Sequence, residues 1–129
     1  MVAVDTNVLV RLLTKDHAGQ AARAVAVFRA GPVFVPKTVL LECEWVLRYS
    51  YARPAASIVL AFLGVLGLPN VTVEDAPAVH LAIRMLERGV DFADALHLAS
   101  SAGATQFVTF DAQLVKRARK TSPLPVALA

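Results

Sequence analysis

Short, nearly all-apolar runs alternate along the chain with longer segments that have helix boundary signals. The short runs predict β-strands, at Val2–Val4, Val33–Val35, Val71–Val73, Gln106–Thr109 and Pro125–Leu128. Between them we expect helices, over Thr6–Leu13, Asp16–Ala30, 37–51, 54–68, Ala76–Arg88, Asp91–Ala102 and Ala112–Lys120. Boundary residues support these helices, because Pro54 suits a helix start and Gly89 suits a left-handed turn after a helix end.

This alternation predicts the fold class. Nearly all-apolar strands are typical of parallel sheets that are covered on both faces. Strands that alternate with helices predict an α/β fold, here a three-layer α/β/α sandwich with a mostly parallel open sheet. The 129 residues contain no repeat, linker or low-complexity segment, so we expect one domain over residues 1–129.

The composition excludes a disordered chain, since 57% of the residues are hydrophobic and the mean hydropathy is +0.57. Two interpretations stay open: a compact core rich in Ala and Val, or apolar surface that a partner covers. The segment "SIVLAFLGVLGL" (57–68) is apolar nearly all round a helix, which indicates full burial or an interface. We expect a homodimer and a groove for an amphipathic helix of a partner.

Charge and cysteine content indicate which partners and which cellular compartment to expect. The net charge of +3 and the pI of about 9.4 favour polyanionic partners. A single cysteine, Cys43, excludes an internal disulfide and fits a reducing cytoplasm. No secretory signal is expected, because Asp5 interrupts the first apolar run. The apolar stretch between Pro54 and Pro69 is shorter than the ~20 residues that span a bilayer, so we expect no membrane partner.

Candidate chemistry lies in carboxylates that the predicted fold places near the carboxyl ends of strands, where open parallel sheets form their sites. Asp5 and Asp111 follow predicted strands, and Asp94 lies in the first turn of a helix that should begin at the same edge. Glu42 lies in the first half of another helix and can reach inward. Carboxylates crowded at one edge repel one another and raise one another's pKa, and a divalent cation relieves this. Hard oxygen ligands favour Mg²⁺ or Mn²⁺ over zinc.

A second interpretation applies to most of these acids. Asp5 and Asp111 can instead be N-caps of the helices that follow them, and Asp91 with Asp94 can form a cap and its partner three residues on. A third interpretation, an aspartyl-phosphate phosphatase with Asp5 as nucleophile, needs a second acid two residues later, where the chain has Asn7.

Two glutamates on one predicted helix have different expected surroundings. Glu42 and Glu44 are two residues apart, so they point in different directions around the helix axis. Glu44 precedes Arg48 by four residues, which predicts a surface ion pair. The neighbours of Glu42 along the helix are mostly apolar, so we expect Glu42 to face inward and to meet a bound cation. The alternative is a buried hydrogen bond to the backbone or to a hydroxyl.

Other motifs are absent or have simple explanations. The sequence has no zinc-ligand spacing, no GxGxxG, no P-loop and no GxSxG. His97 either lies on a helix surface or contacts the substrate or the acids beside it. The basic run Lys116–Lys120 either binds phosphates or forms a solvated face.

Four segments together resemble a known family: "VDTNVLV", "LLECEWVLRYSY", "DFADALHLA" and "FVTFD" are similar to PIN-domain ribonucleases, and most similar to the VapC-type toxins of type II toxin–antitoxin pairs. The resemblance covers nearly the whole chain, in order and at similar spacing. It implies a Mg²⁺ or Mn²⁺ site whose acids are Asp5, Glu42, Asp94 and Asp111. It places around them the residues Asn7, Thr109 and Asp91.

The resemblance also implies an activity and partners. It implies endonucleolytic cleavage of RNA, homodimerisation, and inhibition by an antitoxin encoded beside the gene. Basic residues beside the acids would grip the RNA backbone, and the candidates are Arg11, Lys15, Lys37 and Arg48. The alternatives are a PIN-type nuclease that processes RNA without an antitoxin, and a binding module whose acids serve only as caps.

Overall fold

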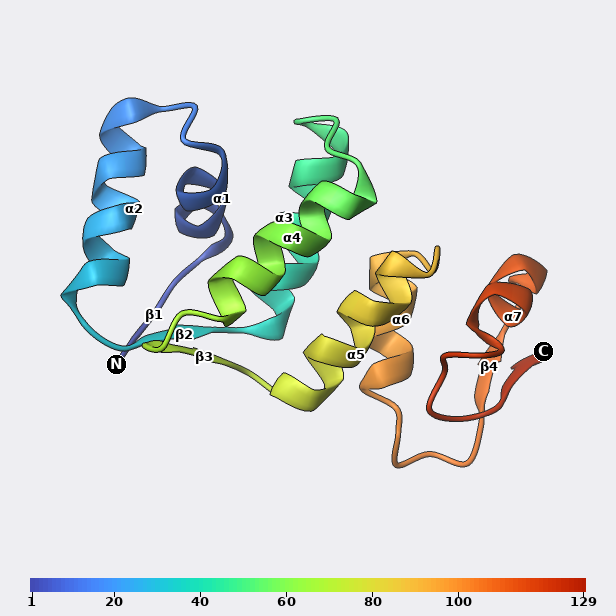
Figure 1. The fold of residues 1–129 in the computed structure, drawn as a ribbon. Coiled ribbons are helices and arrows are strands. Elements are labelled where there is room, and N and C mark those ends of the chain that lie inside the picture. Colours follow the sequence, from blue (N-terminus) through green and yellow to red (C-terminus); the bar gives the residue numbers. More distant parts are fainter. The chain divides into compact units, whose positions relative to one another are not determined.

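The computed structural model describes residues 1–129, which form two compact units, Met1–Asp75 and Ala76–Ala129. Every predicted strand and helix is present, with ends within three residues of those expected. In chain order the elements are β1 (Val2–Ala3), α1 (Thr6–Thr14), α2 (Ala18–Ala30), β2 (Val33–Val35), α3 (Lys37–Tyr49), α4 (Ala55–Leu66), β3 (Val71–Val73), α5 (Ala76–Glu87), α6 (Phe92–Ala99), β4 (Phe107–Thr109), α7 (Ala112–Ala118) and β5 (Val126–Leu128), as Figure 1 shows.

The first unit is built on a three-stranded parallel sheet in the order β1-β2-β3. Val2 pairs with Val33, and Val33 pairs with Val71. Parallel neighbours need a long crossover, and each crossover here is a pair of helices, α1 with α2 and α3 with α4 (Figure 1). The expected parallel pairing of the first three strands is therefore confirmed.

Burial in this sheet is concentrated in its central strand. Val33 and Val35 of β2 are fully buried, and they contribute to a core with Leu9 of α1, Leu40 of α3 and Phe62 of α4. The expectation that all strands are buried on both faces is wrong for β1, where Val2 is 53% exposed. The reason is that β1 and β3 are edge strands of this sheet, whereas β2 has a neighbour on each side.

The second unit contains the parallel pair β4–β5, in which Phe107 pairs with Val126. α7 forms the crossover between these strands, and α5 packs against α6. Gly89, which follows α5, has a φ of +93°, so the predicted left-handed turn is confirmed. α6 ends at Ala99, three residues earlier than expected. There the hydroxyl of Ser101 donates to the carbonyl of His97 at 2.7 Å, which competes with continued helix.

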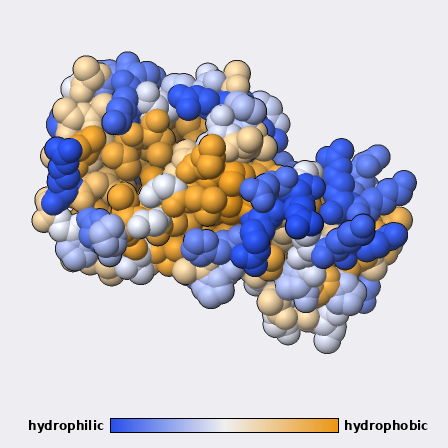
Figure 2. Space-filling model, in the orientation of Figure 1, coloured by the Kyte–Doolittle hydropathy of each residue, from blue (hydrophilic) through white to orange (hydrophobic).

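α4 is apolar on both its buried and its exposed side. Ile58 and Phe62 are buried, whereas Leu60 is 72% exposed and Leu63 is 43% exposed. Figure 2 shows hydrophobic side chains gathered over the region of this helix. None of the helices combines the length and the apolar content that a membrane span requires.

Candidate active site

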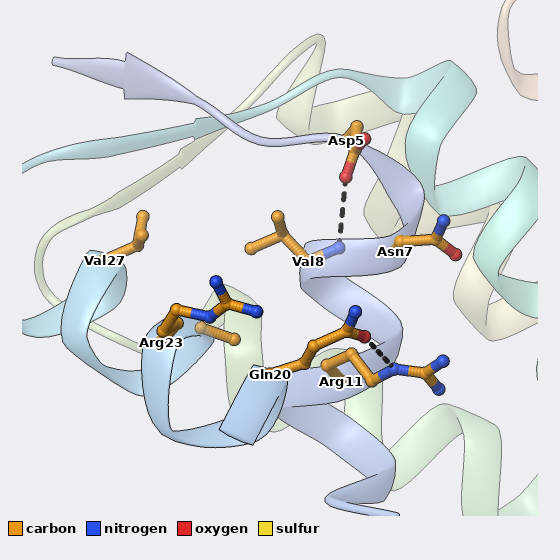
Figure 3. A pocket seen from close by; sticks show the side chains of 8 residues that line it. Asp5, Asn7, Val8, Arg11, Gln20, Arg23 and Val27 are labelled. Carbon is orange, nitrogen blue, oxygen red and sulfur yellow. Dashed lines mark hydrogen bonds between the residues drawn. The ribbon is translucent and has the colours of Figure 1, made fainter. Parts of the chain in front are cut away.

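Asp5 lies where β1 passes into α1, and it is the N-cap of that helix. Its backbone is extended, and its Oδ1 atom accepts a hydrogen bond of 3.1 Å from the amide of Val8 (Figure 3). This bond satisfies one of the free amides at the helix start. The cap interpretation of Asp5 is therefore confirmed. The cap occupies one carboxylate oxygen and leaves Oδ2 available to a cation.

Glu42 shares a hollow with Asp5. The hollow has a volume of about 290 Å³ and is lined by Asp5, Thr6, Asn7, Val39, Glu42 and Val46. The hydroxyl of Thr6 donates a hydrogen bond to Oε1 of Glu42, which links α3 to the start of α1. Glu42 therefore has the hydroxyl partner that the alternative interpretation expects. Glu42 is exposed, so the expectation of an inward-facing side chain is wrong. It nevertheless reaches the hollow of Asp5, because its helical neighbours Val39 and Val46 line that hollow too.

Glu44, rather than Glu42, is the buried glutamate of α3. The residue is 1% exposed, because it follows Leu40 by four residues and precedes Leu47 by three on the inward face. The predicted pair with Arg48 is confirmed: Nε lies 3.0 Å from Oε2, and Nη2 donates to Oε1 at 3.1 Å. The predicted surface position of this pair is wrong, since only Arg48 reaches solvent. The guanidinium carbon of Arg48 also lies 4.8 Å from the ring centre of Tyr49.

Two further acids lie at the end of a strand in this sheet and were not among the predicted site residues. Glu74 and Asp75 follow β3 as Asp5 follows β1, so the same strand-end pattern could have identified them. Both are bound by Lys37. Its amide donates to Oε1 of Glu74 at 3.0 Å, and its Nζ atom lies 3.2 Å from Oδ2 of Asp75.

In the second unit, Asp111 is the N-cap of α7, and its loop is held by Thr109. The Oδ1 atom of Asp111 accepts hydrogen bonds from the amides of Gln113 (2.9 Å) and Leu114 (3.1 Å). The amide of Asp111 donates to the hydroxyl of Thr109 at 3.0 Å. Thr109 thus fixes the backbone that carries Asp111.

Asp94 lies in the first turn of α6, whose N-cap is Asp91. Oδ2 of Asp91 accepts a hydrogen bond of 3.2 Å from the amide of Asp94. Burial, followed by the charge of Asp91 and then that of Asp111, raises the pKa of Asp94, whereas His97 opposes the rise. The charges of Asp91 and Asp111 therefore both act on the carboxyl of Asp94.

The donor set fits a hard divalent cation better than zinc. Asp5 with Glu42, and Asp94 with Asp111, offer carboxylate oxygens, the ligands that Mg²⁺ and Mn²⁺ prefer. Burial raises the pKa of the Cys43 thiol to about 12, so no thiolate is available. Neither unit by itself groups three or more His, Cys, Asp or Glu side chains into a complete metal site. Each unit supplies two of the predicted acids.

Three of the four predicted RNA-binding cations are engaged within the first unit. Arg11 binds Asp16, Lys37 binds Asp75, and Arg48 binds Glu44. Lys15 is exposed in a left-handed turn after α1. The run Lys116–Lys120 is exposed except at Ala118, which fits a solvated face. Arg23 was not predicted, although it lines a hollow beside Asp5.

Comparison with known proteins gives the family. No curated protein matches the chain. The model of the PIN domain matches residues 2–120, which include every predicted acid. PIN domains are generally metal-dependent nucleases, and the seven helices and parallel strands agree with their α/β/α fold class. The chain therefore belongs to the PIN domain family.

Proposed function

We propose that this protein is a Mg²⁺- or Mn²⁺-dependent endoribonuclease whose catalytic acids are Asp5, Glu42, Asp94 and Asp111. One observation carries the proposal: in a chain of the PIN family, these four acids occur as two close pairs. Asp5 and Glu42 line one hollow, and Asp111 is near enough to Asp94 to raise its pKa. The proposal treats both units as parts of one functional domain.

The side chains have distinct proposed tasks. Asp5 and Asp94 are the principal metal ligands, and Glu42 and Asp111 hold a second cation or the attacking water. A bound divalent cation lowers the pKa of a coordinated water and offsets the charge on a phosphoryl oxygen. Thr6 holds the carboxylate of Glu42 in place through its hydroxyl.

The test is substitution of Asp5 by Asn. Asn caps helices about as well as Asp, so Asp5→Asn should fold with nearly unchanged thermal stability. It should lose RNA cleavage in Mg²⁺ and bind Mn²⁺ more weakly in calorimetric titration, because a charged ligand is gone. Cleavage at the parent rate would contradict the assignment of Asp5. A parent protein without saturable Mn²⁺ binding would indicate a module whose acids serve only as caps.

We further propose that the nuclease is the toxin of a toxin–antitoxin pair, acts in the cytoplasm, and forms a homodimer. The resemblance to VapC-type toxins supports the biological role, and the single free cysteine agrees with a reducing compartment. The exposed apolar side of α4 supports a protein interface. Expression of the native operon should yield a small co-purifying protein that abolishes cleavage. A gene without such a neighbour would favour a PIN nuclease of RNA processing.

A further inference from the structure

A second hollow lies on the other side of Asp5, between α1 and α2. Its volume is about 350 Å³, within the range of small-molecule sites. It is lined by Asp5, Asn7, Val8, Arg11, Gln20, Arg23, Ala24 and Val27 (Figure 3). Asp5 and Asn7 line both this hollow and the one that contains Glu42. A ligand that extends away from Asp5 on the α2 side therefore enters this space.

Arg11 is a fixed part of the wall. Its Nη1 atom lies 3.0 Å from Oδ1 of Asp16 and donates to the hydroxyl of Tyr51 at 2.9 Å. Its Nε atom donates to Oε1 of Gln20 at 2.7 Å. Because a guanidinium only donates, Gln20 must turn its carbonyl oxygen toward Arg11. The amide nitrogen of Gln20 then points into the hollow, as Figure 3 shows.

Arg23 supplies an unpaired positive charge. Its guanidinium points into the same space (Figure 3), and it makes no ion pair or side-chain hydrogen bond within the chain. Arg23 and the amide nitrogen of Gln20 are both donors, so the occupant must offer acceptors, at least one of them anionic. Apart from Asp5 and Asn7, the remaining wall is apolar, formed by Val8, Ala24 and Val27, and suits a flat ring or a sugar.

We propose that this hollow binds the nucleotide next to the cleaved bond of an RNA substrate. Arg23 contacts its phosphate, the amide of Gln20 donates to an acceptor on its base, and the base lies against the apolar wall. The proposal rests on the proposed function, because it takes the scissile phosphate to lie at Asp5. An RNA chain can occupy the site at Asp5 and the hollow at the same time, with one phosphate at Asp5 and the next at Arg23.

RNA binding without metal tests this proposal. Fluorescence anisotropy with a fluorescein-labelled, single-stranded RNA of mixed sequence would compare parent, Arg23→Gln and Arg29→Gln in EDTA. Arg29 is the matched control, because it is exposed on the same helix and lies outside the hollow. Arg23→Gln should weaken binding about tenfold, the effect of a lost charge-assisted hydrogen bond. It should also reduce the slope of log K against log salt by about one. Arg29→Gln should change affinity less than about twofold.

A second variant tests the amide nitrogen of Gln20 as a hydrogen-bond donor to RNA. Gln20→Glu retains an oxygen for Arg11 but replaces the amide nitrogen by a second oxygen, so RNA affinity should fall without loss of thermal stability.

In cleavage assays with Mg²⁺, Arg23→Gln should raise KM about tenfold and leave kcat within about twofold, because the contact lies away from the reacting phosphate.

The outcomes separate this inference from the proposed function. Equal RNA affinity and salt slope for Arg23→Gln and Arg29→Gln overturn the inference, whether or not the parent cleaves RNA. If the parent binds RNA through Arg23 but does not cleave it in Mg²⁺ or Mn²⁺, the hollow remains an RNA-binding site and the proposed nuclease function is refuted. If Arg23→Gln binds RNA as tightly as the parent but no longer co-purifies with a small protein, the hollow binds a protein partner. This outcome also overturns the inference.

Discussion

Replacing Glu44 by Gln removes the charge from the one buried carboxylate of α3. Two contacts join Glu44 to Arg48, at 3.0 and 3.1 Å, in a side-by-side geometry that favours strong pairing. The Glu44 side chain is 2% exposed and that of Arg48 is 36% exposed. The substitution therefore leaves a half-buried guanidinium opposite a neutral amide, and the amide nitrogen of the glutamine faces an N–H donor of Arg48.

The size of the effect follows from this burial. Removing one partner of a fully buried ion pair costs about 3–5 kcal/mol. Arg48 keeps part of its hydration, so we expect a loss of about 2 kcal/mol in the free energy of unfolding. For a chain of this length that corresponds to a fall in Tm of roughly 8 °C. Glu42→Gln, two residues away, should change Tm by less than about 2 °C, because Glu42 is exposed and an amide oxygen still accepts from Thr6.

The assay pairs thermal unfolding, followed by circular dichroism, with RNA cleavage in Mg²⁺ below the melting range. Glu44→Gln should be unstable but active, and Glu42→Gln should be stable but inactive. Adding Arg48→Met to Glu44→Gln should recover part of the lost stability, because the uncompensated charge is gone. A Tm of Glu44→Gln equal to that of the parent would refute the reasoning about the pair. Full activity of Glu42→Gln would remove that residue from the site.

Two further predictions concern other parts of the chain. Since burial raises the pKa of Cys43 from 9.0 to about 12, iodoacetamide at pH 8 should label it only after unfolding. The folded protein binds this proton more tightly, so its contribution to stability is complete below pH 9 and is lost as pH rises toward 12; fast labelling of the native thiol would contradict its burial. Leu60→Lys should leave Tm nearly unchanged, because Leu60 is 72% exposed, and should shift light-scattering mass toward a monomer. A dimer that persists would place the interface away from α4.

Much of the fold was predictable because its signals are local. The strands β2 and β3 match the predicted runs Val33–Val35 and Val71–Val73 residue for residue, since short apolar runs flanked by Gly, Pro or Asn have few alternatives. Gly89 gave the end of α5 for the same reason. Whether a strand lies at the edge or in the centre of a sheet depends on its pairing with distant segments. The exposure of Val2 therefore could not be deduced from the apolar run that contains it.

The positions of Asp5 and Asp111 just after strands were predictable from the sequence, but the surroundings of the candidate residues were not. Glu44 was assigned to the surface because a glutamate four residues before an arginine is typical of an ion pair on a helix surface. Its position between Leu40 and Leu47 on the inward face indicates burial, which its pair with Arg48 makes tolerable. Arg23 was overlooked because nothing in the sequence near α2 indicates that the helix lines a hollow shared with Asp5. Such a hollow arises only when α1 and α2 pack together.

The choice between helix cap and metal ligand, which the sequence left open for Asp5 and Asp111, is not exclusive in this structure. Each caps its helix through Oδ1 alone, so Oδ2 is left for a cation. The cap also restricts the rotation of the carboxylate, which lowers the entropy lost when the ligand is ordered around a metal. A strand that ends in an aspartate at a helix start therefore supplies a carboxylate that is already oriented before metal or RNA binds. Under the proposed function, cap and metal ligand therefore share the same positions, at the carboxyl ends of β1 and β4.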